Sequence, residues 1–135
     1  MWVPAVATAL SIPFAFLVYL WPDGRMALIF YLPGMVLGGM WLGPTFATTQ
    51  GLVPPVMRAT AAAILLFVIN IIGLGLGPQG TGILSDLLEP QFGQESLRYA
   101  LLSVVVVFGL WSMLHFFLAA RTLASDMKAK LDLSD

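Results

Sequence analysis

The chain has 135 residues, of which 59% are hydrophobic and only 10% are charged, and its formal net charge is −1. A water-soluble domain with so few charges could not cover its apolar surface, so this composition indicates an integral membrane protein. The charge balance excludes a basic nucleic-acid interface, and the absence of cysteine excludes disulfides and thiolate metal sites.

Four ion-free apolar blocks follow one another and predict an all-α integral membrane fold with four transmembrane helices. They are continuous, which favours helices over the alternating strands of a barrel. A helix rising about 1.5 Å per residue needs about 20 residues to cross a hydrocarbon core of about 30 Å. The blocks cover about 3–21, 26–53, 59–85 and 99–120 in a membrane region 1–120, and a charged tail covers 121–135.

The first block, 3–21, begins almost directly after Met1, with no basic residue before it. A secretory signal peptide needs a basic segment and a shorter apolar core, so that interpretation is disfavoured. The abrupt start predicts that further sequence precedes the chain. A tight turn at 21–25 with Trp21 at the membrane interface is expected to end the block.

The second block, 26–53, is rich in helix breakers, and Pro33 and Pro44 predict that it bends or breaks. A discontinuous span lined by polar groups is where transporters often bind their substrates. Alternatively, the threonines of this block satisfy backbone groups that the prolines free. The side chains that recur at helical spacing on one side are Trp41, Thr45, Thr48 and Thr49.

The third block, 59–85, contains a glycine-rich run that starts at Asn70. Gly73 and Gly77 stand one turn apart and Pro78 weakens the helical ladder, which predicts a packing face with a kink or, alternatively, a hinge. Asn70, near mid-span, predicts either a hydrogen bond to a neighbouring helix or a side chain that faces water. A nucleotide-binding glycine motif is excluded because no strand precedes the run.

The fourth block, 99–120, follows a loop expected at 86–98 and contains the only histidine, His115. Without a carboxylate inside any block, His115 is interpreted as a packing or interfacial residue and not as a proton relay. The tail, 121–135, is expected to form a short surface helix. Because no catalytic or metal-ligating constellation occurs, the sequence predicts no enzyme activity, no cofactor and no metal.

The basic residues predict the orientation of the chain. An even number of spans places both termini and the second loop on one side of the membrane. The positive-inside rule makes this the cytoplasmic side of a plasma, or inner, membrane, because it holds more of the basic residues. It carries Arg58, Arg121, Lys128 and Lys130, and the opposite side carries Arg25 and Arg98.

The stretch from Gly51 to Ala61 carries a resemblance to a known family. Its Arg58-Ala59-Thr60-Ala61 entry into the third block, together with the four-block pattern, resembles spans nine to twelve of a major facilitator superfamily transporter, most closely the spinster-like branch. The resemblance covers essentially the whole chain. It implies part of the C-terminal six-helix half of that fold, with Arg58 capping the cytoplasmic loop and Thr60 starting the helix.

The resemblance also implies a function. The family consists of secondary transporters that work by alternating access, so the expectation is a small organic or lipid-like solute and no nucleic-acid partner. The segment at Gly77 and Pro78 resembles the antiporter motif, but the glycines that follow are not adjacent, so antiport is not implied. The second and third blocks would line the central cavity. Its implied candidates are Thr45, Thr48, Gln50, Asn70 and Gln79.

The resemblance implies that the eight preceding spans of such a transporter are missing partners and that a lone chain is inactive.

Two other classes of protein are alternatives. A dimeric small multidrug-type transporter has a similar length, but it needs an acidic residue in its first span, and 3–21 has none. A non-transporting membrane scaffold or assembly subunit is the second alternative.

Overall fold

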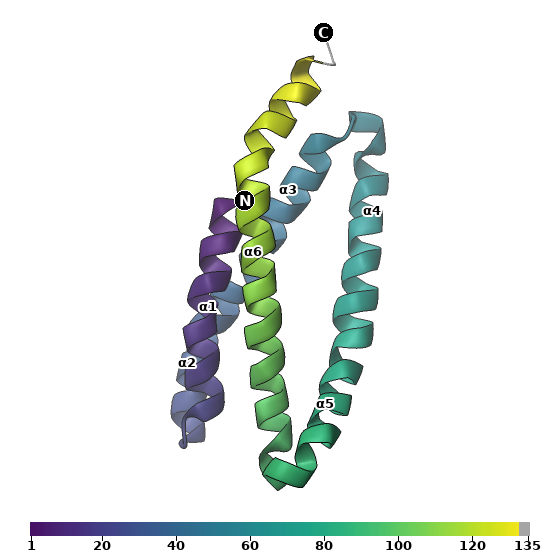
Figure 1. The fold of residues 1–135 in the computed structure, drawn as a ribbon. Helices are drawn as coiled ribbons and strands as arrows, with labels where there is room; N and C mark the ends of the chain where they lie inside the picture. Colours follow the sequence, from purple (N-terminus) through teal and green to yellow (C-terminus); the bar gives the residue numbers. More distant parts are fainter. Residues whose placement is uncertain (133–135) are drawn as a thin grey trace.

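The computed structural model describes residues 1–132, with the side chains of 1–129, and the described chain is helical apart from short turns (Figure 1). This confirms the all-α prediction. In chain order the elements are α1 (Trp2–Leu20), α2 (Gly24–Gly39), α3 (Leu42–Leu52), the 3₁₀ turn η1 (Pro55–Met57), α4 (Arg58–Val68), the π-helix η2 (Ile69–Leu76), α5 (Gly77–Phe92), the 3₁₀ turn η3 (Gly93–Glu95) and α6 (Ser96–Asp132).

The helices run back and forth along one direction (Figure 1). The α1–α2 turn and the α5–α6 turn lie at the same end, and the α3–α4 turn lies at the other. α1 packs against α2 and α6, and α5 packs against α6. α4, η2 and α5 follow one another without a gap and form one rod, and the main neighbour of α4 outside this rod is α3. The molecule therefore has a packed side, α1–α2–α6 with α5, and a more open side at α4 and η2.

The interior is made of small residues and the exterior of large apolar ones. Ala100 is fully buried and Pro4 is almost so, and the other buried apolar residues are alanines of α1. By contrast Leu74 is 74% exposed and Leu28 is 68% exposed. In water such a surface would be strongly unfavourable, but membrane helices associate through small residues and leave large ones to the lipid. The packing supports the predicted membrane location.

Three helical segments are long and apolar enough to cross a membrane, judged by length and composition among the described residues. The third contains both the third and the fourth predicted blocks, because the helical backbone continues through the turn at η3. The count of four spans therefore stays a prediction. The segments are Trp2–Leu20, Gly24–Leu52 and Pro55–Ala129.

The last turn is shorter than the predicted loop at 86–98. α5 continues to Phe92, and Gly93 reverses the chain with φ +55°, a conformation that glycine adopts without steric cost. The charged residues near the end of α5 do not end the helix, because charged side chains leave the backbone hydrogen bonds of a helix intact. The helix ends at Phe92 because the next residue, Gly93, has a positive φ. The tail also differs from the expected separate surface helix, since α6 continues without a break to Asp132. Residues 133–135 lie outside the described part.

Candidate functional site

A break in the second predicted block is the first feature of the candidate site. α2 ends at Gly39 and α3 starts at Leu42, so the chain leaves the helix at Met40 and Trp41. Pro44 has no N–H to donate to the Met40 carbonyl, and the two glycines before the break are weak helix formers. Pro33 lies inside α2 and does not end it. The break predicted from the prolines is therefore present, but only one of the two prolines stands beside it.

Thr45 bonds back to the start of α3. Its backbone N–H and its hydroxyl both donate to the Trp41 carbonyl, with N···O and O···O distances of 3.1 Å and 2.7 Å. Pro44 frees the Met40 carbonyl, so the Thr45 hydroxyl bonds the neighbouring carbonyl and not the one that the proline leaves without a donor. The predicted role of the threonines in satisfying groups freed by the prolines stays a prediction. Whether its remaining lone pairs also meet a solute stays a prediction.

A cavity of about 390 Å³ lies beside this break, among α1, α2 and α6. Its wall combines hydroxyl groups and aromatic rings. The Ser11 hydroxyl donates to the Thr8 carbonyl at 2.7 Å, whereas the Thr8 and Ser112 hydroxyls form no hydrogen bond with any residue that the structure describes. These hydroxyls are available to a bound molecule. The wall includes Thr8, Ser11, Ser112, Trp41, Phe108 and Phe116.

A second, smaller cavity of about 190 Å³ continues the first toward the α1–α2 turn. The two share Ser11, Gly38 and Val105 in their walls. Tyr19 and Tyr31 add phenol groups to the smaller one. Sequence reasoning singled out Trp41 but missed the polar residues of α1 and α6, because their convergence depends on helices far apart in the chain.

The other predicted cavity residues lie on two separate parts of the chain, α3 and the segment formed by η2 and α5. Thr48, on α3, is half-buried and its hydroxyl lies 4.0 Å from the Met1 sulfur, and Gln50 is half-buried near the end of α3. Asn70 lies on η2 and Gln79 on α5, and both are exposed. Among the described residues no side-chain hydrogen bond joins the α3 group to the η2–α5 group. Their convergence on one cavity remains a prediction.

Asn70 bonds to its own helix. Its side-chain Nδ2 donates to the Leu66 carbonyl at 2.7 Å, at the junction where α4 changes into the π-helix η2. The Ile69 N–H is shared between the Leu65 and Leu66 carbonyls at the same junction. The sequence-based alternatives for Asn70, a neighbouring helix or water, did not include this bond. The amide oxygen stays available to either.

The predicted packing and hinge residues fall in or beside η2. A Cβ added at Gly73 would meet no heavy atom within 4 Å, and one added at Gly77 would meet only a backbone oxygen of the same rod. Pro78 follows directly, at the first turn of α5. Close helix approach occurs elsewhere, at Gly34 beside Phe14 and at Gly109 beside Ile12. Within the described chain the η2 glycines face open space, and their role stays a prediction.

The predicted loop motif stands at the start of α4. The helix begins at Arg58, two residues earlier than the start at Thr60 that the family resemblance implied, because the 3₁₀ turn η1 leads directly into it. Both side chains are exposed. The Arg58 guanidinium forms no ion pair or hydrogen bond with the described residues, and its backbone N–H donates to the Pro55 carbonyl.

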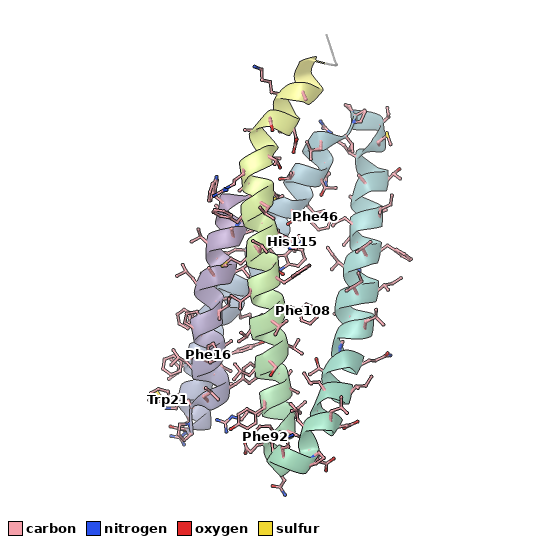
Figure 2. The ribbon with its side chains drawn as sticks, viewed as in Figure 1. Phe16, Trp21, Phe46, Phe92, Phe108 and His115 are labelled. Atoms are coloured by element: carbon pink, nitrogen blue, oxygen red, sulfur yellow. The ribbon has the colours of Figure 1, made fainter. Side chains whose placement is uncertain are left out.

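His115 lies with aromatic residues. Its ring is 4.6 Å from that of Trp111, and its Nδ1 is 2.9 Å from the Trp111 carbonyl oxygen. In Figure 2, His115 and Phe108 of α6 and Phe46 of α3 lie on the side of their helices toward α4. No group of three potential metal ligands occurs in the described part of the chain. The surroundings of His115 thus offer stacking surface and no acid–base partner.

Arg98 is a structural residue that sequence reasoning missed. Its guanidinium donates to the Tyr19 and Trp21 carbonyls, the second at 3.0 Å, and pairs with Glu95 at 2.8 Å. A cation at the end of a helix satisfies the last carbonyls and opposes the helix dipole. Arg98 therefore caps α1 and ties it to the α5–α6 turn. A sequence pattern gave no signal for a contact between such distant positions.

The chain is similar to one curated protein, an MFS-type efflux pump of Mycolicibacterium smegmatis. The two are 31% identical over 127 residues, which cover 94% of this chain and 29% of that protein. No protein-family model and no solved structure matches the chain. This similarity agrees with the resemblance to the major facilitator superfamily that the sequence indicated. The chain spans less than a third of the length of this relative.

Proposed function

We propose that the chain is the substrate-contacting part of a secondary active transporter that moves a small organic or lipid-like solute by alternating access. The observation that carries this proposal is the interrupted α2–α3 segment, whose break opens on a cavity lined by hydroxyls and aromatic rings. Interrupted spans at membrane depth are tolerated where they line a cavity, and they often form transporter sites. The similarity to an efflux pump supports the same class and favours outward transport.

The proposed solute is uncharged or weakly polar. The cavity wall contains no ionised side chain, and its aromatic rings give mainly apolar contact with a few hydroxyl groups for orientation. A strongly charged solute would lose its hydration without a compensating partner. The finer assignment of the chain to spans nine to twelve of the spinster-like branch is part of this proposal.

The transport proposal is tested by filling the cavity. Ser112→Leu places a bulky side chain into the cavity, and we expect full-length protein carrying it to lose about tenfold or more in transport, equivalent to about 1.4 kcal/mol of binding. Ser103→Leu is the matched control, because Ser103 lies on the same helix but is exposed and outside the cavity. Equal transport by the two variants, at equal expression, would remove the cavity from the mechanism.

The membrane topology is a second part of the proposal. We propose four spans with both termini in the cytoplasm. This is supported by the α1–α2 and α5–α6 turns, which lie at one end of the bundle (Figure 1), and by the larger number of basic residues in the second loop and the tail than in the other two loops. Reporter fusions after Asp23 and after Gln91 are expected outside, and those after Arg58 and after the C-terminal Asp135 inside. An inside signal at Gln91 contradicts the four-span arrangement.

We further propose that these residues act together with additional spans. This proposal is supported by the resemblance to the last four spans of a twelve-span transporter and by the similarity to an efflux pump of which the chain covers 29%. In liposomes the 135-residue chain alone is expected to show no saturable, concentrative uptake. Ion-coupled uptake by the chain alone would support instead the dimeric small-transporter class.

A further inference from the structure

We propose that Asn70 is a positioning residue whose side-chain amide holds the π-helical register of η2 and thereby sets the rotation of α4 relative to α5. This inference rests on the proposed transport function for its physiological meaning, but the structural part is independent of it. It assigns Asn70 neither to substrate contact nor to contact with another helix.

The length of η2 needs a cause. π-helices are rare and mostly form single-turn bulges inside α-helices, whereas η2 extends over eight residues, Ile69–Leu76. A segment with i→i+5 bonds competes with an α-helix of the same sequence. The features that select the π register should therefore lie at its two ends.

Asn70 marks the entry. Its Nδ2 donates to the Leu66 carbonyl, an acceptor that an α-helix would reserve for the backbone N–H of Asn70. The Ile69 N–H also reaches Leu66 as well as Leu65, so the acceptor is crowded. The side-chain donor competes with the backbone N–H of Asn70 for this acceptor, and the π-helix begins at the preceding residue, Ile69.

Pro78 marks the exit. The Gly77 N–H donates to the Ile72 carbonyl, an i→i+5 bond, and so is not bonded to Gly73 as in an α-helix. The next donor in the π register would be Pro78, which has no N–H. The Gly73 carbonyl therefore has neither an α-type nor a π-type donor, and the π ladder stops there. In an α-helix the ring of Pro78 would instead meet the Leu74 carbonyl, so the wider register relieves that clash.

The surroundings let the two halves of the rod turn independently. α5 is held to α6 by the buried Thr81 and Ser96 and by the hydroxyl contact of Ser85 with Ser96 at 3.1 Å. α4 is packed mainly on α3, near the turn. A change of η2 from the π to the α register would lengthen the rod and rotate α4 relative to α5, because an α-helix has fewer residues per turn than a π-helix.

The test compares Asn70→Ser with Asn70→Ala, which differ by one oxygen atom. A serine hydroxyl can make the same bond to the carbonyl one turn earlier, as Ser103 does to Tyr99 at 2.8 Å. Spin labels at Ile64 and Ile83, both exposed, report the distance across η2 by pulsed electron paramagnetic resonance in the full-length protein without other cysteines. Labels at Ile83 and Val107 are the control pair, because they join α5 to α6 and do not span η2.

We expect Asn70→Ala to shift the Ile64–Ile83 distance, leaving the control distance unchanged, and Asn70→Ser to keep both at the wild-type values. Pro78→Ala, which restores an N–H at the other end, should shift the first distance in the same direction. Transport should fall with Asn70→Ala and be retained with Asn70→Ser. If Asn70→Ala keeps the wild-type distance, the register role of Asn70 is refuted, and so it is if Asn70→Ser shifts the distance as far as Asn70→Ala. Since the distances are measured without solute, an absence of transport in the wild type would refute the proposed function alone.

Discussion

The α1–α2–α6 side and the α4–η2 side of this molecule are built from similar apolar residues, yet only the first is tightly packed. In the packed side, Gly34 and Gly109 let neighbouring helices approach so closely that a Cβ at either would lie within 3.4 Å of Phe14 or Ile12. On the open side, Gly73 sits in an equally glycine-rich segment and faces no neighbour within 4 Å. Glycine content alone thus does not tell which helices pack.

The comparison also separates two uses of helix irregularity. On the packed side, the break at Met40 and Trp41 opens beside a cavity, and the Thr45 hydroxyl donates a hydrogen bond to the Trp41 carbonyl. On the open side, the π-helix η2 is continuous and is bordered by Asn70 and Pro78. The first irregularity creates space for a ligand, and the second adjusts the angle between two halves of a rod.

The largest expected effect comes from adding a side chain at a close contact between α1 and α6. Gly109→Val places a stiff, branched side chain where a Cβ would already lie 3.3 Å from the Ile12 side chain. We expect a loss of about 3 kcal/mol in the free energy of unfolding, measured by SDS titration of full-length protein in mixed micelles.

Gly73→Val is its control, since Gly73 is also a glycine within a helical segment but a Cβ there would meet no neighbour within 4 Å. We expect a change within about 0.5 kcal/mol at Gly73. A large loss there would break the comparison, because it would mean that another part of the protein covers η2. A small loss at Gly109 would mean that α1 and α6 separate more easily than their packing indicates.

The next effect concerns the two ends of the molecule. Arg98→Ala removes the cap on α1 and the pair with Glu95, and leaves two carbonyls without their donor. Because the Arg98 side chain is about a third exposed, we expect a loss of about 2 kcal/mol, below the full value of buried charge-assisted bonds. Arg58→Ala, at an exposed arginine of α4, should cost less than about 0.5 kcal/mol in the same assay. Equal losses would show that Arg58 has a partner outside this chain.

Much of the fold follows from local sequence, and the exceptions have physical causes. Ion-free apolar blocks predicted the helices, and proline-rich or glycine-rich segments predicted the turns near 21–25 and 54–58. The sequence did not predict that η2 is a π-helix, since α- and π-helices place apolar residues in the same blocks and differ only in which carbonyl each N–H selects. It also placed the third loop too early, because charge was taken as the end of a helix that ends at Gly93.

The candidate site was less predictable than the fold. Trp41 and Thr45 could be found from the prolines and the helical spacing, because the break is local. Ser112 and Ser11 could not, since their convergence depends on how α6 packs on α1, which is decided by Gly109 and a few alanines. The cavity-lining role that the family resemblance implies for residues such as Gln79 stays a prediction.

The smallest expected effect compares two threonines of the third predicted block. Thr81, on the packed side, is buried at 9% exposure and its hydroxyl donates to the Gly77 carbonyl at 2.9 Å. Thr81→Val keeps the branched shape and removes the donor, so we expect a loss of about 0.6–1 kcal/mol, the usual value for such a bond between membrane-embedded groups.

Thr60→Val tests the same chemical change on the open side. Thr60 is exposed on α4 and donates no hydrogen bond to a described residue, so we expect no measurable loss in the SDS titration. The difference in stability loss between the two variants isolates the contribution of the Thr81 hydrogen bond to the Gly77 carbonyl, because both substitutions remove a threonine hydroxyl and keep the branched side chain. If Thr81→Val is neutral too, the hydroxyl bond within α5 adds nothing measurable to stability. The packed side then owes its stability at Thr81 to the burial of the branched side chain, which valine keeps, and not to the hydroxyl.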